Sequence, residues 1–331
     1  MVAFKSQYHI VKKLGAGQFS QVHVAVRKTT ADAIVARYRS SARAAADRRH
    51  MVAVLRAGMV ALKTRMRDDM AIEEAGESLD REVAVLLAIK SSPNASLASI
   101  IDSDDVPSRK QGYIMPVYAG ITLQALNNLW QPGDDRWPAS FAWHICLQLV
   151  QSICNLHGIS QAAGRPAISH RDLHEGNILL CKASAGDIRG NYPNVVMIDF
   201  GQASMTGSDA SAAAKDMEFE RQIQDYREVI PHMQAIDTKA QPAGLDDCLH
   251  TLEAVVNRRP SRTALQSAVR EFVLRATIER DRAEDDDGDE NHGSDEPDTP
   301  EPYRDLPRDL AALFDREVVS DEELVKVLLR E

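Results

Sequence analysis

Two short segments of the chain carry side chains that could accept a proton or hold a cation. The first, residues 170–177, reads His-Arg-Asp-Leu-His-Glu-Gly-Asn, so that Asp172 and Asn177 lie five positions apart. The second, Asp199-Phe200-Gly201, follows a short apolar run. One loop can present both Asp172 and Asn177, whereas Asp-Phe-Gly alone is often just a strand end and a turn. The two segments together therefore indicate chemistry more strongly than either does alone.

Three further features precede these segments. Residues 15–20, Gly-Ala-Gly-Gln-Phe-Ser, form a glycine-bearing turn between two apolar segments, 8–14 and 21–26, which is typical of a β-hairpin. Val60-Ala61-Leu62-Lys63 places a lysine in a third expected strand. Glu82 lies where the apolar spacing predicts an amphipathic helix. Each feature also has an ordinary interpretation, such as a plain turn or a solvated acid, so the joint order of all five carries the argument.

The rest of the pattern indicates which elements position these residues. Residues 112–118 are expected to form a strand, 140–157 a long apolar helix, and 178–181 and 195–198 two short strands around a polar loop. From position 216 to about 282 the chain is expected to be helical. Strands that come first and helices that come later favour an α+β protein with two segregated lobes.

The five features, in this order, resemble the signature set of the protein kinases: glycine-rich loop, strand lysine, helix glutamate, catalytic loop and Asp-Phe-Gly segment. The resemblance covers Tyr8 to roughly Gln202. It implies a two-lobed protein kinase-like fold, with an N-terminal β-sheet lobe that has one main helix and a mostly helical C-terminal lobe. It also implies an ATP- and Mg²⁺-dependent phosphotransferase, in the first place a protein kinase that phosphorylates Ser or Thr hydroxyls.

The resemblance implies a role for each motif. Lys63 would bind the α- and β-phosphates, Glu82 would hold Lys63, and Asp172 would accept the proton of the attacking hydroxyl. Asn177 and Asp199 would hold Mg²⁺. Asn177 also counts, with Lys63, Glu82 and Asp172, among the predicted catalytic residues. The residues that would contact ATP are Gly15, Ala16, Gly17, Gln18, Phe19, Ser20, Val22, Ala61, Lys63, Met115, Pro116 and Tyr118. Among these, Met115 falls at the gatekeeper position, and 116–118 at the hinge that meets adenine.

The sequence departs from the family after the catalytic aspartate and after the Asp-Phe-Gly segment. Kinases that act on Ser or Thr carry a lysine at the position of His174. With a histidine there, the loop is closer to that of aminoglycoside and choline kinases. Alternatively, His174 only hydrogen-bonds its own loop. The segment after Gly201 is short and lacks an Ala-Pro-Glu equivalent, so Arg171 would lack its usual phosphate partner. Candidate phosphorylation sites in it are Thr206, Ser208 and Ser211.

Three functions therefore stay open. A Ser/Thr protein kinase would act on a protein substrate, and a small-molecule kinase, favoured by His174, would act on a small hydroxylated metabolite. A non-catalytic scaffold is disfavoured because the lysine, the two aspartates and the asparagine of the motifs are all intact.

A later helix is expected to supply an acid that buttresses the catalytic loop, either Asp225 or its rival Asp216.

A basic insertion stands where the family normally has a tight turn, and an acidic stretch follows later in the chain. Residues 29–58 are rich in Ala and Arg and are expected to be helical, whereas 284–301 carry many acids and neither Lys nor Arg. The acidic stretch is expected to be disordered and, because of its opposite charge, to contact the basic insertion. Ser320 is expected to be the N-cap of a last helix.

We therefore expect four parts of the chain. They are an N-lobe over 1–119 with the insertion at about 29–58, a C-lobe over 120–280, an acidic disordered linker over 281–302 and a helical tail over 303–331.

Composition limits the partners. The acids of residues 284–301 account for the net charge of −10, and the rest of the chain is close to neutral. We therefore expect neither nucleic acid nor a membrane as a partner. No apolar run approaches the roughly 20 residues that cross a bilayer, and the first residues lack a secretory signal. The four cysteines are scattered, without a CxxC spacing. We expect an intracellular protein, cytoplasmic and/or nuclear.

Overall fold

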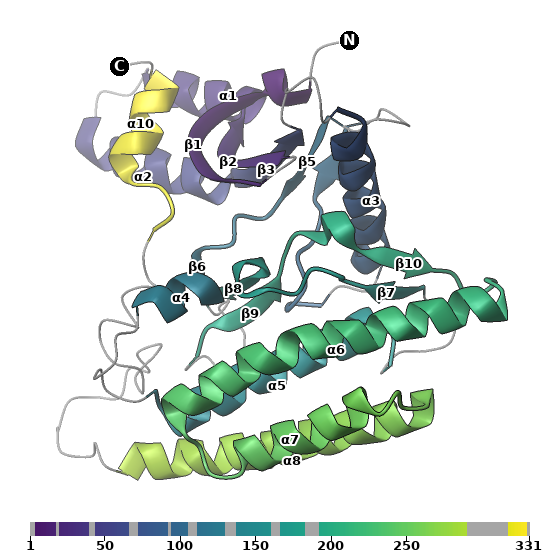
Figure 1. The fold of residues 1–331 in the computed structure, drawn as a ribbon. Helices are drawn as coiled ribbons and strands as arrows, with labels where there is room; N and C mark the ends of the chain where they lie inside the picture. Colours follow the sequence, from purple (N-terminus) through teal and green to yellow (C-terminus); the bar gives the residue numbers. More distant parts are fainter. Residues whose placement is uncertain are drawn as a thin grey trace. The chain divides into compact units, whose positions relative to one another are not determined.

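The chain forms a mixed α+β structure with an antiparallel sheet in its N-terminal part and a helical C-terminal part (Figure 1). The computed structural model describes residues 4–17, 20–39, 44–65, 72–91, 94–104, 111–129, 137–159, 166–182, 192–289 and 317–329. Two compact units divide it: the first joins 1–91, 99–118 and 317–331, and the second joins 92–98 and 119–316. The first unit therefore contains both ends of the chain.

The first unit is built on a five-stranded antiparallel sheet in the order β1-β2-β3-β5-β4, preceded by a 3₁₀ turn at Phe4–Gln7. The strands are β1 (Tyr8–Ala16), β2 (Ser20–Arg27), β3 (Met59–Arg65), β4 (Asp102–Ser103) and β5 (Gly112–Met115). The predicted hairpin around the glycine turn is confirmed, because β1 pairs antiparallel with β2. The strand predicted over 112–118 ends early at Met115, since Pro116 has no N–H to continue the ladder.

Both faces of this sheet are covered. Neighbouring residues of a strand point to opposite faces, so Val24 and Ala25 of β2 belong to different buried clusters. The cluster of Ala25 also holds Tyr8, Leu62 and Ile114. Helix α3 (Ile72–Lys90) packs against β3. Val22, Val24 and Val26 of β2 share one face, whereas Ala25 lies on the other face between the polar residues His23 and Arg27.

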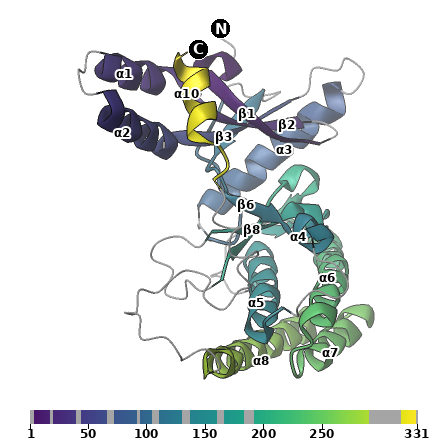
Figure 2. The same ribbon diagram turned by 90° about the vertical axis from the view of Figure 1, so that its left-hand side faces the viewer.

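The insertion is helical, as predicted, and consists of α1 (Lys28–Arg39) and α2 (Ala44–Ala57). The two helices pack against each other, and α1 also packs against β2. The last helix, α10 (Asp321–Leu329), lies beside β1 and α2 (Figures 1 and 2). Ser320 is its N-cap, as predicted: the Ser320 Oγ accepts the N–H of Glu323 at 3.2 Å, and the Glu323 carboxylate accepts the N–H of Ser320 at 2.9 Å.

The second unit is dominated by helices. They are α4 (Leu123–Leu129), α5 (Ala139–Leu156), α6 (Ala212–Ala240), α7 (Leu245–Asn257) and α8 (Arg262–Asp289). Helix α5 is buried on nearly every side because it packs against both α6 and α8, and α7 also packs against these two helices (Figure 1). An apolar helix that has neighbours on several sides is the expected centre of a helical core.

One helix extends into the segment that we expected to be disordered. Helix α8 continues to Asp289, so the prediction of disorder from residue 281 is wrong as far as that residue. A helix that has already formed adds each further residue at little cost, and the Arg282 guanidinium pairs with Glu279 at 3.1 Å within its last described turns. Residues 290–302 of the expected linker, and 303–316 of the expected tail, lie outside the described residues.

Two small sheets and two 3₁₀ turns complete the second unit. The sheets join β6 (Gly120–Thr122), β8 (Ile178–Cys181) and β9 (Asn194–Met197) in one set, and β7 (Ala167–Ser169) and β10 (Ser204–Thr206) in the other. The turns are η2 (Glu175–Asn177) and η3 (Phe200–Gln202). Both short strands that were predicted on the two sides of the polar loop are present, as β8 and β9. Residues 170–177 come directly before β8, and the Asp-Phe-Gly segment follows β9.

Candidate active site

The first group of candidate residues is a buried ion pair in the first unit. The Lys63 Nζ lies 2.8 Å from each carboxylate oxygen of Glu82, and the side chains are 6% and 2% exposed. Strand β3 supplies the lysine and helix α3 the glutamate, as predicted. Taking two charges out of water costs much of what their attraction returns, so a buried pair of this kind is weak evidence for stability alone. Its position instead suits a lysine that is held ready for an anionic ligand.

The glycine turn is open on its outer side. The Gly17 N–H donates to the Ser20 carbonyl at 2.9 Å and closes the hairpin. Among the described residues, a Cβ atom built on Gly15 or Gly17 would meet no atom within 4 Å, and neither residue has a positive φ. The fold itself therefore does not explain these glycines, whereas the close approach of a ligand to the backbone would. Gln18 and Phe19 lie outside the described residues.

The residues predicted to meet adenine lie at the end of the same sheet. Met115 is the last residue of β5 and is paired with Ala61, while Val22 is paired with Lys63. Cross-strand partners share a face, so Val22, Lys63 and Ala61 lie on one face of the sheet. The Tyr118 hydroxyl accepts the N–H of Ser99 at 2.8 Å, which anchors the end of the predicted hinge.

A buried carboxylate of α6 holds residues 170–171 at the start of the predicted catalytic loop in the second unit. Asp225 is 0% exposed and accepts the backbone N–H groups of His170 and Arg171, each at 2.8 Å. The His157 Nε2 also lies 2.8 Å from this carboxylate. Asp225, rather than Asp216, is thus the acid that buttresses the loop.

Two further residues of α6 bind the same loop, and the sequence reasoning missed them. The Glu228 carboxylate accepts the N–H of Leu173 at 3.0 Å, and the His232 Nε2 donates to the Leu173 carbonyl at 3.2 Å. They follow Asp225 by three and seven positions, which places them on one helix face. Extending the helical period from Asp225 would have found both.

Asn177 is oriented by Asp172. The Asn177 Nδ2 donates to the backbone carbonyl of Asp172 at 2.9 Å and to its carboxylate at 3.2 Å. Because the amide nitrogen is used in this way, the amide oxygen is left as the acceptor that can face a cation. Such an oxygen is a ligand that magnesium accepts.

Asp199 is joined to the predicted catalytic loop through its neighbour Ile198. The Ile198 N–H donates to the Asn177 carbonyl, and the His170 Nε2–H donates to the Ile198 carbonyl, both at 3.0 Å. Asp199 has φ of 63° and Arg171 has φ of 65°, so two non-glycine residues adopt the left-handed conformation. Such backbone strain is concentrated at functional sites. The second unit therefore brings together all three residues predicted to act on the hydroxyl and the metal.

His170 is a neutral spacer between these segments. Burial lowers the pKa of His170, although the nearby carboxylates, Asp225 first, oppose the shift. Its ring packs on that of Phe200 with centroids 4.8 Å apart. A buried neutral imidazole that donates from Nε2 gives the loop a fixed distance from the Asp-Phe-Gly segment.

His174 hydrogen-bonds its own loop, as one of the two interpretations predicted. Its Nδ1 accepts the Gly176 N–H at 3.0 Å, which places the proton of the neutral ring on Nε2, 3.9 Å from the Asp172 carboxylate. A Cβ on Gly176 would come within 2.8 Å of the His174 ring. A side chain at position 176 would therefore require the His174 ring to move.

The short segment after Gly201 is held by Glu218, another residue that the sequence analysis missed. The Glu218 carboxylate is buried and accepts the hydroxyls of Ser169 at 2.6 Å, Ser204 at 3.0 Å and Thr206 at 3.2 Å. It thereby fastens both strands of the β7–β10 pair to α6. Of the candidate phosphorylation sites, Thr206 is engaged in this network, and the Ser211 hydroxyl caps α6 by accepting the Ala214 N–H.

The described residues contain neither a large cluster of metal-binding side chains nor a helix that could span a membrane. In that part of the chain, no group of three or more His, Cys, Asp or Glu side chains could hold a metal ion. An aspartate with an asparagine is a smaller set of ligands, yet Mg²⁺ is usually bound by one or two carboxylates together with substrate phosphates. None of the helices that the structure describes is both long and apolar enough to cross a bilayer.

Comparison with known proteins gives no assignment, because neither a protein-family model nor a curated protein matches this chain.

Proposed function

We propose that this chain is an ATP- and Mg²⁺-dependent phosphotransferase with a protein kinase-like fold, which phosphorylates Ser or Thr hydroxyls of a protein. The observation that carries the proposal is the buried contact between Lys63 and Glu82. The two residues are nineteen positions apart and were singled out by motif rather than by charge pairing. A buried ion pair that stabilises little by itself is well explained by the need to hold a cation for a phosphate ligand.

In this proposal the first unit binds the nucleotide. Lys63 neutralises the phosphates, and the backbone of residues 15–20 approaches their oxygens where the two glycines leave open space. The apolar face that carries Val22 and Ala61, with Met115 opposite Ala61, accepts the adenine ring. Apolar walls with a few fixed polar groups are typical of nucleotide sites.

The second unit supplies the proton acceptor and the metal ligands. The acceptor hydroxyl oxygen forms a bond to the γ-phosphorus, its proton passes to the Asp172 carboxylate, and the bond from phosphorus to the β,γ-bridging oxygen breaks to release ADP. Magnesium, when bound, supplies positive charge to the phosphate oxygens. The Asn177 amide oxygen and the Asp199 carboxylate would hold it, and the hydrogen bond from Asn177 Nδ2 orients Asp172.

A small-molecule kinase is the second candidate, and the geometry of His174 favours it. The His174 ring accepts the Gly176 N–H and lies 3.9 Å from the Asp172 carboxylate, at the position where a Ser/Thr kinase carries a lysine. The acceptor would then be a small hydroxylated metabolite. A non-catalytic scaffold is the third and least favoured candidate, because all the motif residues are intact.

Incubation with labelled ATP and Mg²⁺ tests these functions. We expect label on a generic basic protein or on the chain itself, and loss of labelling in Lys63→Met and Asp199→Asn while both variants stay folded. Label only on members of a panel of hydroxylated metabolites would select the second candidate. Turnover that survives in either variant, or its complete absence with every acceptor, would overturn the proposal.

A further inference from the structure

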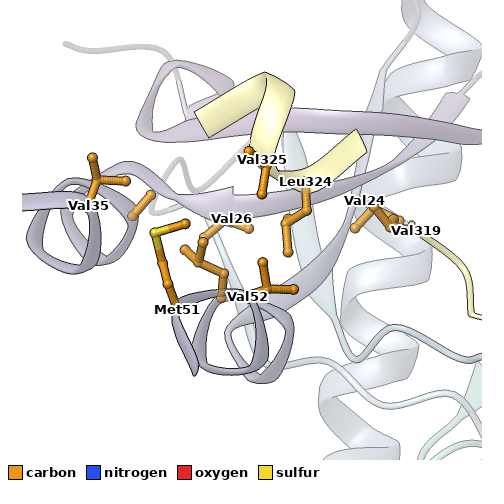
Figure 3. Close-up of a cluster of buried hydrophobic side chains, with 10 residues drawn as sticks. Val24, Val26, Val35, Met51, Val52, Val319, Leu324 and Val325 are labelled. Carbon is orange, nitrogen blue, oxygen red and sulfur yellow. The ribbon is translucent and has the colours of Figure 1, made fainter. Parts of the chain in front are cut away.

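The end of the chain is part of the hydrophobic core of the first unit. Val319 and Leu324 are 0% exposed and Val325 is 3% exposed. Figure 3 shows these side chains pointing into one cluster with residues of β2 and of the insertion. The other buried members are Val24, Val26, Ala31, Val35, Met51, Val52 and Leu55. Residues that lie more than 260 positions apart in the sequence therefore share one core.

The insertion depends on this segment for burial. Helices α1 and α2 are rich in alanine and arginine, and each has only a narrow apolar side. Met51, Val52 and Leu55 of α2 face the cluster that the C-terminal segment fills. Two short helices with narrow apolar sides gain little stability alone, so the insertion and the C-terminal segment complete each other.

Polar contacts fix the register of this docking. The Arg56 guanidinium binds the Glu317 carboxylate at 2.6 Å, the Val319 carbonyl at 3.1 Å and the Asp321 carboxylate. The Lys12 Nζ lies 3.1 Å from Glu323, whose carboxylate also closes the N-cap of α10. One arginine binds Glu317, two positions before the buried valine, and Asp321, the first residue of α10, and thereby fixes Val319 inward.

The docked segment lies on the face of the sheet predicted to bind the nucleotide. Val24, a member of the cluster, is paired across the strands with Ala61, and Val22 on the same face is paired with Lys63. Val117, from the predicted adenine-binding hinge, packs against this cluster as well. Val319 and Val24 are members of the same buried cluster, which Figure 3 shows. The core that includes Val319 is therefore continuous with the predicted adenine-binding surface.

We propose that residues 317–326 dock on the α1–α2 insertion and thereby position the nucleotide-binding face of the first unit, with Val319 acting on Val24 and Val117. Val319 is a positioning residue here, since it is fully buried. The docking part stands on the contacts alone, whereas the nucleotide part rests on the proposed function. The acidic residues that bind the insertion are thus Glu317 and Asp321 among those described, while the side chains of 284–301 lie outside the described residues.

The test uses charge reversal in the full chain. Arg56→Glu would repel both acids, and the triple variant with Glu317→Arg and Asp321→Arg would restore the attraction with opposite signs. Arg49→Glu, an exposed arginine of the same helix, is the matched control. The measurements are amide hydrogen exchange of α1, α2 and α10, and the Kd of Mg-ATP by calorimetry. We expect exchange in all three helices to rise by about tenfold or more in Arg56→Glu, and the Kd of Mg-ATP to rise about three- to tenfold.

The outcomes separate the two parts of the proposal. Recovery of both readouts in the triple variant, with no change in Arg49→Glu, supports the whole. If α10 exchanges faster while α1 and α2 do not, the insertion does not depend on the segment and the docking part is overturned. Faster exchange with an unchanged Kd would overturn the positioning part. No Mg-ATP binding by the native chain would refute the proposed function but leave the docking result valid. Leu324→Asp is a second variant that should release the C-terminal segment from the core.

Discussion

The carboxylate of Asp225 accepts the backbone N–H of His170 at 2.8 Å, and both residues are 0% exposed. This contact ties the loop that carries Asp172 to a long helix that begins after the Asp-Phe-Gly segment. The same carboxylate accepts the next backbone N–H, that of Arg171, which has a positive φ. The strained conformation of the loop is therefore held by hydrogen bonds to a buried charge, which are stronger than neutral ones.

Removing that charge should destabilise the second unit. In Asp225→Asn one acceptor oxygen remains for donors that include two backbone N–H groups and His157, so we expect a loss of about 3 kcal/mol in the free energy of unfolding. Denaturant unfolding measures it. Asp216→Asn, in the same helix, is the control and should change stability by less than about 0.5 kcal/mol. Equal effects at both positions would contradict the role of Asp225.

The stability should depend on pH through His170. Its pKa is lowered from 6.5 by burial, so the unfolded chain binds a proton at a higher pH than the folded one. Stability is therefore fully present above pH 6.5 and is lost as the pH falls from 6.5 towards the folded pKa, by about 1.4 kcal/mol for each pKa unit of the shift.

His170→Gln provides the comparison for this pH effect. The variant removes the titration but keeps a side-chain donor for the Ile198 carbonyl. Because His23 also has a pKa lowered by burial, only the difference between native and variant unfolding curves isolates His170. Parallel curves between pH 7 and pH 4.5 would show that His170 does not contribute.

Alanine at Gly17 should separate ligand binding from folding. The added methyl group meets no atom within 4 Å and needs no positive φ, so we expect the free energy of unfolding to stay equal or to rise by less than about 1 kcal/mol. Mg-ATP should nevertheless bind more weakly, because the Cβ occupies the space that the phosphates would enter.

Gly120→Ala is the contrasting variant. Its Cβ would lie 2.0 Å from the Leu180 carbonyl oxygen in the β6–β8 pair, so we expect a large loss of stability there. If Gly17→Ala binds Mg-ATP as tightly as the native chain in calorimetry, the glycine turn does not contact the phosphates.

A negative charge at Thr206 should loosen the segment that follows Gly201. Thr206→Glu places a second carboxylate against buried Glu218 and removes the hydroxyl that Glu218 accepts, so we expect a loss of about 1–2 kcal/mol and faster hydrogen exchange in β10. Ser208→Glu, at an exposed position, should leave both unchanged. Phosphorylation of Thr206 would act in the same direction. An unaffected β10 in Thr206→Glu would count against the Glu218 network.

The cysteines should be unreactive in the folded chain. All four are free and buried, and burial raises the pKa of Cys154 to about 11 and that of Cys181 to about 12. A thiol reagent at pH 8 should label the native chain only as it opens, and denaturant should release all four thiols. Since the unfolded thiols ionise near pH 9.0 and the folded ones do not, stability should fall as the pH rises above 9.0. Rapid labelling of any cysteine in the native chain would contradict this burial.

Local patterns in the amino-acid sequence predicted several of the elements, and the motifs singled out the candidate residues. Alternating valines and the glycine turn predicted the β1–β2 hairpin, and the apolar spacing around Glu82 predicted α3, because these signals are local and periodic. Ser320 could be named as an N-cap for the same reason. The pairing of Lys63 with Glu82 was also predicted, although through the resemblance to kinases and not through any local signal.

Tertiary structure decided which distant residues meet. Only the packing of α6 against the loop selects Asp225 over Asp216, and only the fold brings Glu218 to three hydroxyls of two strands. The C-terminal segment was recognised as helical, but no local pattern says that Val319 and Leu324 complete the core beside Val24. Such contacts join residues far apart in the chain, and the burial that stabilises them exists only once the intervening elements have folded.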